Sequence, residues 1–437
     1  MIQPKTLPGF MSLLPEDQVI FDEMKEVIRK NFEKYGFLPL DTPVLESSEI
    51  LLAKSGGETE KQIYEFKRGE NDLCMRFDLP VPLAKYVAEN LNELNFPFAR
   101  YEIAKVYRGE RPQKGRFREF YQCDIDVIGR ENLSPIYDAQ MPSIIYNIFK
   151  ELNIGDFTIY INNRKILIGL MQELGLENAS TEVLRLVDKL DKIGEENFAV
   201  SLEKDYGVAK EKIQKILDFI KISGSVDEQL EILQKENFQN ETYRQGVEEL
   251  KTVVKYMKAF GVPETNFAIK ISIVRGHDYY TGTVFETFLN NNQNIGCICG
   301  GGRYDNLAEY YTKEKLPGVG ISIGLTRLFY QLKENKMLSE NAPAIAKAII
   351  LPMSEETLEP SIELSNKLRE NDINVAIYLE NKKFKNKIQY ASKSKIKFAI
   401  FVGEDEVAQK VYTIKNLYTT EQTQVDFENL IKILKEN

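Results

Sequence analysis

The sequence predicts an α+β protein of about three domains, and three observations support this. The length of 437 residues suits roughly three domains. A polar loop at 108–116 separates two runs that favour strands, 98–107 and 117–128, as in an antiparallel hairpin. From residue 347 onward, short strands and helices alternate, which is typical of a small α/β domain.

The composition is that of an ordinary globular chain. Hydrophobic residues make up 43% of the sequence, charged residues 28%, and the net charge is −9. No run of about 18 uncharged apolar residues occurs, so we expect no membrane span. The N-terminus lacks the basic-then-apolar layout of a secretory signal. The four cysteines form no CxxC pair, and these features together predict a cytoplasmic protein with reduced thiols.

The sequence contains a single histidine, His277, and this excludes several chemistries. Ser-His-Asp catalysis, zinc sites built on several histidines, HExxH proteases and ATP sites that need paired histidines are disfavoured. The absence of a GxxxxGK[ST] stretch disfavours a P-loop. The negative net charge argues against general coating of nucleic acid, although local basic patches could still contact phosphates.

The loop inside the hairpin is a candidate anion site, because it carries Arg108, Arg111, Lys114 and Arg116. Guanidinium groups match phosphate oxygens, and flanking strands would hold them rigidly. In the second strand Gln122 and Asp126 share one face and would form the floor of a polar site. A basic hairpin on a solvated surface explains the same residue types equally well.

Apolar spacing and turn residues predict the elements around this hairpin. We expect helices at 18–35, 83–90 and 135–152, and strands at 37–45, 72–78 and 157–162. Asp78 lies where a strand passes into a helix, a frequent place for functional side chains. Residues 164–260 are rich in Lys, Glu and Leu and predict an inserted helical region without a recognisable chemical motif.

Strands are expected again at 268–274, 283–289 and 294–299, with Arg275 between the first two. Three glycines, 300–302, follow the third strand. They would let a ligand approach the backbone closely, but a tight turn is the more ordinary interpretation. Cys297 and Cys299 alternate on this strand and are expected in the core rather than at a metal. Residues 318–330 predict a strand followed by a helix with Arg327 in its first turn.

In the C-terminal region we expect strands at 347–351, 374–379 and 398–402 and helices at 356–371 and 384–392, which predicts a partly parallel sheet. Residues 381–400 contain seven lysines and no acidic residue. This is a local positive patch in an acidic chain. A solvated lysine-rich helix is the alternative interpretation.

Several of these stretches resemble one family. Residues 107–129, with RPQKGRFREFYQ, resemble motif 2 of class II aminoacyl-tRNA synthetases in its histidyl-tRNA synthetase form. RGHDYYTGTVFE at 275–286 and GGRYD at 301–305 resemble the two signature motifs of that family. Residues 318–328 resemble motif 3, residues 26–46 the dimer-forming motif 1, and the C-terminal block a class IIa anticodon-binding domain. The resemblance is specific because the motifs follow in order along the whole chain.

The resemblance implies a class II catalytic domain, with an antiparallel sheet flanked by helices, at 1–163 and 263–335. It further implies a helical insertion at 164–262, a linker at 336–346 and an α/β anticodon-binding domain at 347–437. The implied activity is that of a cytoplasmic, homodimeric histidine–tRNA ligase. Such an enzyme joins L-histidine to ATP as an adenylate, with Mg²⁺ accompanying ATP, and then acylates the 3′ end of tRNA(His). No protein side chain is expected to bind a metal.

The resemblance also implies the site residues. Arg108 and Arg275 would be catalytic, flanking the α-phosphate and neutralising the charge that develops there. ATP would contact Arg108, Glu110, Arg116, Phe120 and Arg327, with the adenine ring between Phe120 and Arg327. Histidine would contact Asp78, Pro80, Arg108, Gln122, Asp126, Arg275, Tyr279 and Tyr280. The tRNA would contact Gln113, Lys382, Lys383, Lys385 and Lys387.

Four positions depart from the commoner family pattern. Pro80 stands where a threonine is often found, Ser12 replaces an aspartate, Thr326 replaces a frequent acid, and His277 occupies a usually apolar position. Two alternatives remain. One is a catalytically inactive paralogue, such as the regulatory subunit of ATP phosphoribosyltransferase, which typically lacks the anticodon domain. The other is a class IIa synthetase for proline, threonine or glycine, which the stretch at 275–286 disfavours.

Overall fold

A computed structural model describes residues 2–52, 60–112, 115–236, 238–275, 279–291, 296–338 and 344–436. The chain divides into two compact units: residues 1–12 with 23–338, and residues 13–22 with 339–437. The first unit contains an eight-stranded sheet and a separate three-stranded sheet, and the second contains a five-stranded sheet. No helix in the described ranges is long and apolar enough to cross a membrane.

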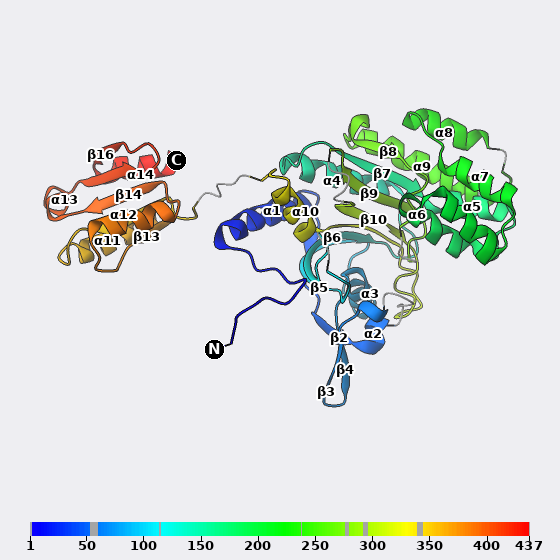
Figure 1. The fold of residues 1–437 in the computed structure, drawn as a ribbon, viewed down its shortest axis with the longest axis horizontal. Coiled ribbons are helices and arrows are strands. Elements are labelled where there is room, and N and C mark those ends of the chain that lie inside the picture. The colour runs from blue at the N-terminus through cyan, green and yellow to red at the C-terminus, as the bar shows by residue number, and fades with distance from the viewer. Residues whose placement is uncertain are drawn as a thin grey trace. The chain divides into compact units, whose positions relative to one another are not determined.

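The eight-stranded sheet carries the candidate site (Figure 1). In spatial order its strands are β1 (Leu38–Pro39), β5 (Phe98–Tyr107), β6 (Glu119–Ile128), β11 (Gly318–Ile323), β10 (Cys299–Tyr304), β9 (Thr283–Leu289), β7 (Phe157–Asn163) and β8 (Phe267–Ile269). The outermost pairs, β1–β5 and β7–β8, are parallel, and the pairs between them are antiparallel. The predicted α+β class is confirmed, with a mixed sheet in place of an entirely antiparallel one.

The predicted hairpin is formed by β5 and β6, with Arg100 opposite Asp126 and Tyr107 opposite Glu119. Alternation along β6 sends its odd-numbered residues into the core, where Cys123, Ile125 and Val127 are fully buried. The even-numbered residues therefore face the opposite side of the sheet. This face is the one that the sequence predicted as the floor of a polar site.

Helices cover the core face of the sheet. α1 (Pro15–Lys34) reaches β5 through Phe32, whose ring centre lies 5.9 Å from that of Tyr101. α4 (Ile136–Glu151) contacts β10 and β11, and α10 (Leu325–Glu334) contacts β6. These helices have amphipathic sequences, and burying their apolar sides against the sheet is what stabilises them.

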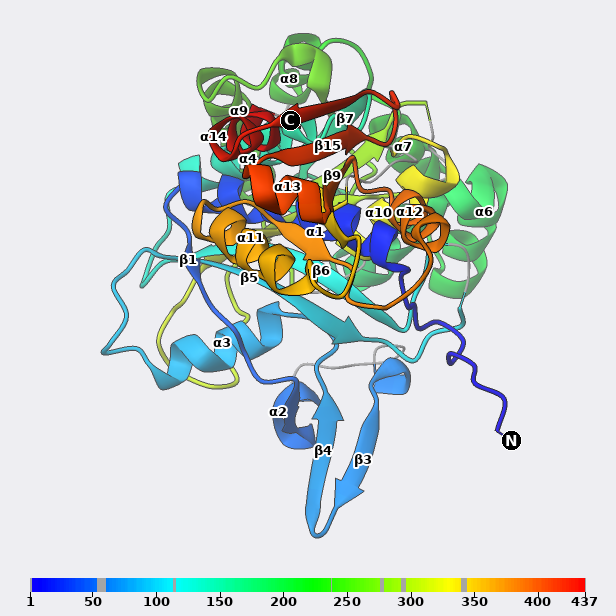
Figure 2. The ribbon, with the colours of Figure 1, turned by 90° about the vertical axis from the view of Figure 1, so that its left-hand side faces the viewer.

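The chain between β1 and β5 forms a small subdomain. It contains α2 (Ser48–Leu52), α3 (Pro80–Glu89), a single 3₁₀ turn (Glu60–Gln62) and the sheet β2 (Leu45–Ser47), β4 (Asn71–Met75), β3 (Glu65–Arg68). The β3–β4 hairpin projects from the body of the first unit in both ribbon views (Figures 1 and 2). Asp78 lies between β4 and α3, at the strand-to-helix transition that the sequence predicted.

The predicted inserted region is helical. It contains α5 (Arg164–Glu173), α6 (Ser180–Tyr206), α7 (Lys210–Ile220), α8 (Val226–Lys235) and α9 (Glu241–Ala259), with 3₁₀ turns at Glu177–Ala179 and Glu264–Asn266. α5 and α9 pack closely, because a Cβ on Gly169 would lie only 2.6 Å from the backbone nitrogen of Tyr243. These helices belong to the first compact unit, so the boundaries of a separate insertion stay a prediction.

The triple glycine corrects one expectation. Gly300–Gly302 do not form a turn after a strand; they lie inside β10, between β9 and β11. A Cβ on Gly301 would lie 2.1 Å from the carbonyl oxygen of Gly320, so a side chain does not fit there. The strand expected at 294–299 includes residues outside the described ranges, and β10 begins at Cys299.

The second unit contains a partly parallel sheet, as predicted. Its strands, in spatial order, are β13 (Val375–Ile377), β12 (Ala348–Pro352), β14 (Phe398–Val402), β15 (Tyr412–Asn416) and β16 (Gln422–Val425). β12 pairs in parallel with β13 and β14, and the remaining pairs are antiparallel. The helices are α11 (Leu358–Glu370), α12 (Phe384–Lys393), α13 (Glu404–Gln409) and α14 (Phe427–Glu436).

Candidate active site

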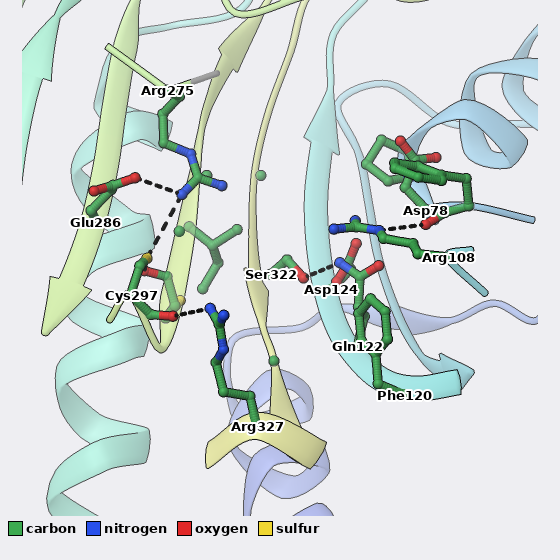
Figure 3. Close-up of a pocket in the computed structure, with 18 of the residues that line it drawn as sticks. Asp78, Arg108, Phe120, Gln122, Asp124, Arg275, Glu286, Cys297, Ser322 and Arg327 are labelled. Carbon is green, nitrogen blue, oxygen red and sulfur yellow. Dashed lines mark hydrogen bonds and ion pairs between the residues drawn. The ribbon is translucent and has the colours of Figure 1, made fainter. Parts of the chain in front are cut away.

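A polar cavity of about 860 Å³ opens on the face of the sheet that carries the even-numbered residues of β6. Its walls come from β6, β9, β10, β11, the starts of α3 and α10, the loop after β5, and α6. Figure 3 shows several of the residues that line it. It brings together all the described residues that were predicted to bind histidine or ATP: Asp78, Pro80, Arg108, Glu110, Arg116, Phe120, Gln122, Asp126, Arg275, Tyr279, Tyr280 and Arg327.

Arg108 lies on one side of the cavity between two phenyl rings. Its guanidinium carbon is 4.3 Å from the ring centre of Phe77 and 5.1 Å from that of Phe120. Its Nε donates to the carbonyl oxygen of Phe77 at 3.2 Å, and its terminal nitrogens point into the cavity (Figure 3). Burial lowers the pKa of Arg108, while Asp78 opposes this shift. The group remains a cation at neutral pH because an arginine pKa starts so high.

Arg275 enters from the opposite side (Figure 3). Its Nη1 donates to Oε1 of Glu286 at 3.0 Å and lies 3.7 Å from Sγ of Cys297. Its φ of +59° is in the left-handed region, which is uncommon for a residue other than glycine. A Cβ on Gly300 would lie 2.2 Å from Nη1 of Arg275. The guanidinium therefore rests directly on the bare backbone of β10.

Asp126 lines the cavity, but both of its carboxylate oxygens already have neighbours. Oδ1 accepts from the hydroxyl of Tyr304 at 2.7 Å, and Oδ2 forms an ion pair with Arg100 at 2.7 Å. Burial raises the pKa of Asp126, while Arg100 opposes this shift. A Cβ on Gly320 would lie 2.0 Å from Oδ1, so a glycine opposite Asp126 makes room for the carboxylate.

Gln122 and Asp78 present oxygens to the same part of the cavity. Nε2 of Gln122 donates to the hydroxyl of Ser322 at 2.7 Å, which fixes the orientation of the amide. Oδ1 of Asp78 accepts from the backbone nitrogen of Val81 at 3.2 Å, in the first turn of α3. Burial raises the pKa of Asp78. Pro80 opens α3, where its missing N–H costs no helical hydrogen bond.

Sequence reasoning missed Asp124, which lies between Gln122 and Asp126 on the same face of β6 and lines the cavity. Its side chain is 1% exposed, and burial raises its pKa well above the usual range. The alternation of residues along β6 was the signal that could have found it. Glu286 and Ser322 were also missed, because their places in the cavity depend on strand pairing far along the chain.

Arg327 connects the loop after β5 to the segment that precedes β10. Its Nε donates to the carbonyl oxygen of Gly115 at 2.9 Å and its Nη1 to that of Cys297 at 3.2 Å. Arg327 and Phe120 both reach into the lower part of the cavity (Figure 3), and the adenine sandwich between them stays a prediction. Nearby, Arg116 and Glu110 form an ion pair at 3.4 Å.

The two cysteines of the CxC stretch differ. Both line the cavity, but Cys299 is buried, as expected, whereas Cys297 is partly exposed. Sγ of Cys297 donates to the carbonyl oxygen of Cys299 at 3.0 Å, and burial raises the pKa of the Cys297 thiol to about 11. Among the described residues, no group of three or more His, Cys, Asp or Glu side chains is arranged to hold a metal ion.

The residues predicted to contact tRNA lie elsewhere. Gln113 falls outside the described residues, as does His277. Lys382, Lys383 and Lys385 are exposed at the start of α12. Lys387 is only 7% exposed, and its ammonium donates to the carbonyl oxygen of Pro352 at 2.6 Å. This corrects the prediction for Lys387, since its charge is held inside the fold.

Thr326, one of the departures from the family pattern, has a structural contact. Its hydroxyl accepts from the backbone nitrogen of Tyr121 at 2.8 Å. The bond joins the first turn of α10 to β6, so this side chain aligns two walls of the cavity. Nothing in the structure explains Ser12.

A mixed sheet flanked by helices, an arginine-rich cavity on it and a second unit with its own sheet are the features expected of a class II aminoacyl-tRNA synthetase. The family model described as histidyl-tRNA synthetase matches residues 9–328, and that described as anticodon binding domain matches residues 347–437. The chain belongs to the histidyl-tRNA synthetase family, and the resemblance seen in its motifs is confirmed.

Similar proteins agree over the whole length. The histidine–tRNA ligase of Clostridium tetani is 54% identical, across 100% of this chain and 99% of that one. The crystal structure of histidyl-tRNA synthetase from Nostoc sp. PCC 7120 has a TM-score of 0.91 and 41% identity, covering 100% of both chains. A Bacillus halodurans structure titled ATP phosphoribosyltransferase regulatory subunit/histidyl-tRNA synthetase has a TM-score of 0.77, 19% identity, and coverage of 92% and 99%. That last likeness concerns the fold alone.

Proposed function

We propose that this chain is a histidine–tRNA ligase, which joins L-histidine to ATP as histidyl-adenylate and then transfers the histidine to the 3′ end of tRNA(His). Family membership over the full chain supports this proposal. The observation that carries it is the pair of guanidinium groups, Arg108 and Arg275, that project into one cavity from opposite sides.

Two arginines suit the chemistry of activation. When the histidine carboxylate attacks the α-phosphate, two anions approach each other and negative charge grows on the phosphate oxygens. Cations held in place before the reaction stabilise that charge more than they stabilise bound ATP. Arg108 and Arg275 would flank the α-phosphate in this way. Mg²⁺ is expected to enter with ATP, where it screens the phosphate charges.

The rest of the cavity divides between the two substrates. The oxygens of Asp78 and Gln122 would accept from the α-ammonium of histidine, and Tyr279 and Tyr280 would line the imidazole. Asp126 would also contact the bound histidine, although its oxygens already contact Tyr304 and Arg100. A site that hydrogen-bonds a polar side chain can reject apolar analogues strongly.

The nucleotide would occupy the lower part of the cavity. Phe120 and Arg327 would enclose the adenine ring, and Glu110 would accept from its amino group. Arg116 and Arg327 would lie near the β- and γ-phosphates. To bind adenine, Glu110 would turn away from Arg116, whose freed guanidinium could then meet the phosphates.

Pyrophosphate exchange with each amino acid in turn tests this proposal. Exchange that depends on histidine alone is the expected result, since it reports both the substrate and the activation step. Exchange with proline, threonine or glycine would point to another class IIa synthetase. Absence of exchange with every amino acid would favour the regulatory paralogue.

For the second unit we propose contact between the lysine patch at the start of α12 and tRNA phosphates. The patch is defined as Lys382, Lys383 and Lys385. Changing these three residues to Ala should weaken tRNA binding and reduce the salt slope by about one for each phosphate that is no longer neutralised. Lys432 and Lys435, changed together to Ala in the same unit, serve as a charge control. An unchanged salt slope in the triple variant would refute the proposed contact between the patch and tRNA phosphates. Gln113 stays a predicted contact of the tRNA acceptor end.

We also propose a homodimer formed through residues 26–46. Leu38 and Leu45 are 60% and 46% exposed, and a second copy would cover these apolar side chains. Analytical ultracentrifugation of the wild type and of Leu38→Glu tests this, because a buried glutamate should shift the population toward monomer. The four cysteines are free thiols, which supports a reducing, cytoplasmic location.

A further inference from the structure

Asp124 is a buried carboxylate in the floor of the cavity for which the activation chemistry above supplies no role. It lies at the middle of β6, near Gln122 (Figure 3), and it lines the cavity together with Gln122 and Asp126. Strand pairing places it opposite Glu102 on β5 and opposite Ser322 on β11. It therefore lies at the centre of the floor, with acidic and hydroxyl neighbours on either side.

The acceptor oxygens of Asp124 and its neighbours differ in whether another group of the protein already contacts them. In Asp126, Oδ1 accepts from the hydroxyl of Tyr304, and Oδ2, which has no hydrogen-bond partner among the described residues, forms an ion pair with Arg100 at 2.7 Å. Oδ1 of Asp124 and Oε1 of Gln122 are likewise buried without a hydrogen-bond partner among those residues, and neither has such an ion pair. Both belong to side chains that line the cavity. Two buried acceptors on neighbouring positions of one strand face thus lack donors.

A buried acceptor without a donor is unfavourable, and a buried carboxylate near other acids is more so. Burial raises the pKa of Asp124, and the negative charges of Asp126 and Glu102 add to this shift, while Arg100 and a hydrogen bond from Ser322 oppose it. Native proteins keep such groups where a ligand completes them. A cationic or N–H-bearing ligand above β6 would supply the missing donor.

We propose that Asp124 is a further substrate-binding residue, which accepts a hydrogen bond from a nitrogen of the bound histidine through Oδ1. This inference rests on the proposed histidine substrate. The α-ammonium offers three donors and the imidazole offers one or two, depending on its protonation. With Asp78 and Gln122, Asp124 gives the floor enough acceptors to satisfy a nitrogen-rich amino acid. If the donor is the imidazole, amino acids without a donor at the same place would leave Oδ1 unpaired and bind more weakly, so Asp124 would then also contribute to specificity.

A purely structural role of Asp124 predicts a different result. If Asp124 only balanced the charge of buried Arg100, removing it would lower thermal stability and leave the affinity for histidine unchanged. If Asp124 contacts histidine, the KM for histidine rises and the KM for ATP does not. The split between the two KM values therefore separates the two roles.

The test compares Asp124→Asn, Asp124→Ala and a matched control, Asp205→Asn. Asp205 lies on α6, is exposed and does not line the cavity, so the control removes an equal charge outside the site. In pyrophosphate exchange, Asp124→Ala should raise the KM for histidine about 10- to 100-fold, as expected when one charge-assisted hydrogen bond is removed. Asp124→Asn should show a smaller rise, since its amide oxygen can still accept. The control should keep both wild-type KM values.

A thermal melt establishes that each variant is folded, and Asp124→Asn keeps the shape of the side chain if the alanine variant does not fold. Wild-type KM for histidine in folded Asp124→Asn and Asp124→Ala would overturn the inference. The proposed function fails separately, when the wild-type chain shows no histidine-dependent exchange at all.

Inhibition by 3-(imidazol-4-yl)propionate, which lacks the α-ammonium, identifies the nitrogen. If Asp124→Ala weakens this inhibitor as much as it weakens histidine, the contact is to the imidazole. If the variant and the wild type bind it equally while histidine binding is impaired, the contact is to the ammonium. Both results support an acceptor at Asp124, and equal binding of histidine and inhibitor to both proteins would refute it.

Discussion

The two arginines that face each other across the cavity are held in opposite ways. Arg108 lies between the rings of Phe77 and Phe120 and bonds to a backbone carbonyl. Arg275 pairs with the carboxylate of Glu286 and lies on the backbone of Gly300. One guanidinium is thus positioned by apolar stacking and the other by charge and by a missing side chain.

This difference indicates how the cavity tolerates two buried cations before substrate binds. Stacking fixes the plane of the Arg108 guanidinium, but the two phenyl rings carry no negative charge that would neutralise it. The partner of Arg275 offsets part of its charge, so burying it is less unfavourable. When phosphate arrives, Arg275 can share its donors between Glu286 and the ligand. We expect the two sides of the cavity to respond differently to mutation.

The largest effect should come from removing either guanidinium. Arg275→Ala should reduce the rate of adenylate formation by about 10²- to 10³-fold, with a smaller change in the KM for ATP, because it stabilises charge that develops in the transition state. Arg108→Ala should lose a similar factor. Transfer from preformed histidyl-adenylate should suffer less in Arg275→Ala. Single-turnover kinetics of both half-reactions measures this, and a melt should change little. Wild-type activation in Arg275→Ala would revive the regulatory-paralogue interpretation.

A smaller effect should follow from Gly300→Ala, which tests the support beneath Arg275. The added Cβ would need the place of Nη1, 2.2 Å away, so the guanidinium must move by about an ångström. Misplacement of that size costs about 10- to 100-fold in kcat. Gly324→Ala is the control, because its Cβ would meet nothing closer than 3.9 Å. Equal kcat values for the two variants would show that the position of Arg275 is not critical.

On the Arg108 side, Phe77→Leu should have a milder effect. It removes one of the two stacked rings, an interaction worth about 0.5–1 kcal/mol, so activation should slow about two- to fivefold. Phe117→Leu is a matched control, since Phe117 lines the cavity but packs on Tyr330, at 5.5 Å between ring centres. If both variants lose the same factor, the stacking on Arg108 has no separate role.

A separate effect, on labelling and not on activity, concerns a thiol on the Arg275 side. The pKa of Cys297 is raised from 9.0 to about 11 by burial and by Glu286, while Arg275 opposes the shift. At pH 8 its thiolate fraction is therefore about 100-fold lower than that of a thiol with the ordinary value. Mass spectrometry after iodoacetamide treatment should find Cys297 labelled slowly. Labelling as fast as that of free cysteine would contradict this.

Local patterns predicted the hairpin well. The expected strand at 98–107 matches β5, and the strands expected at 283–289 and 398–402 match β9 and β14. Alternating side chains and turn residues specify such segments without help from distant parts of the chain. The same alternation identified the face of β6 that lines the cavity.

Distant pairing accounts for what local patterns missed. Three consecutive glycines favour a turn, yet β9 and β11 pair with them on both sides and hold them in a strand. The local pattern indicates a surface position for Lys387, but its stem is buried and its ammonium reaches the carbonyl of Pro352. The hydrogen bond from Tyr304 to Asp126 joins residues 178 positions apart, and the local sequence around either residue cannot predict it.

Strand order also sets when the cavity can exist during synthesis. One edge of β6 pairs with β5, its neighbour in sequence, and the other edge pairs with β11, which is synthesised much later. The hydrogen bond from Gln122 to Ser322 therefore joins residues 200 positions apart. A chain still growing on the ribosome therefore carries Asp124 and Asp126 on a strand with one open edge until β11 has emerged. Such edges invite pairing with other chains. Histidine and ATP can stabilise the cavity only once β11 has paired with β6. Until then the nascent chain has an unpaired strand edge that bound substrates cannot cover.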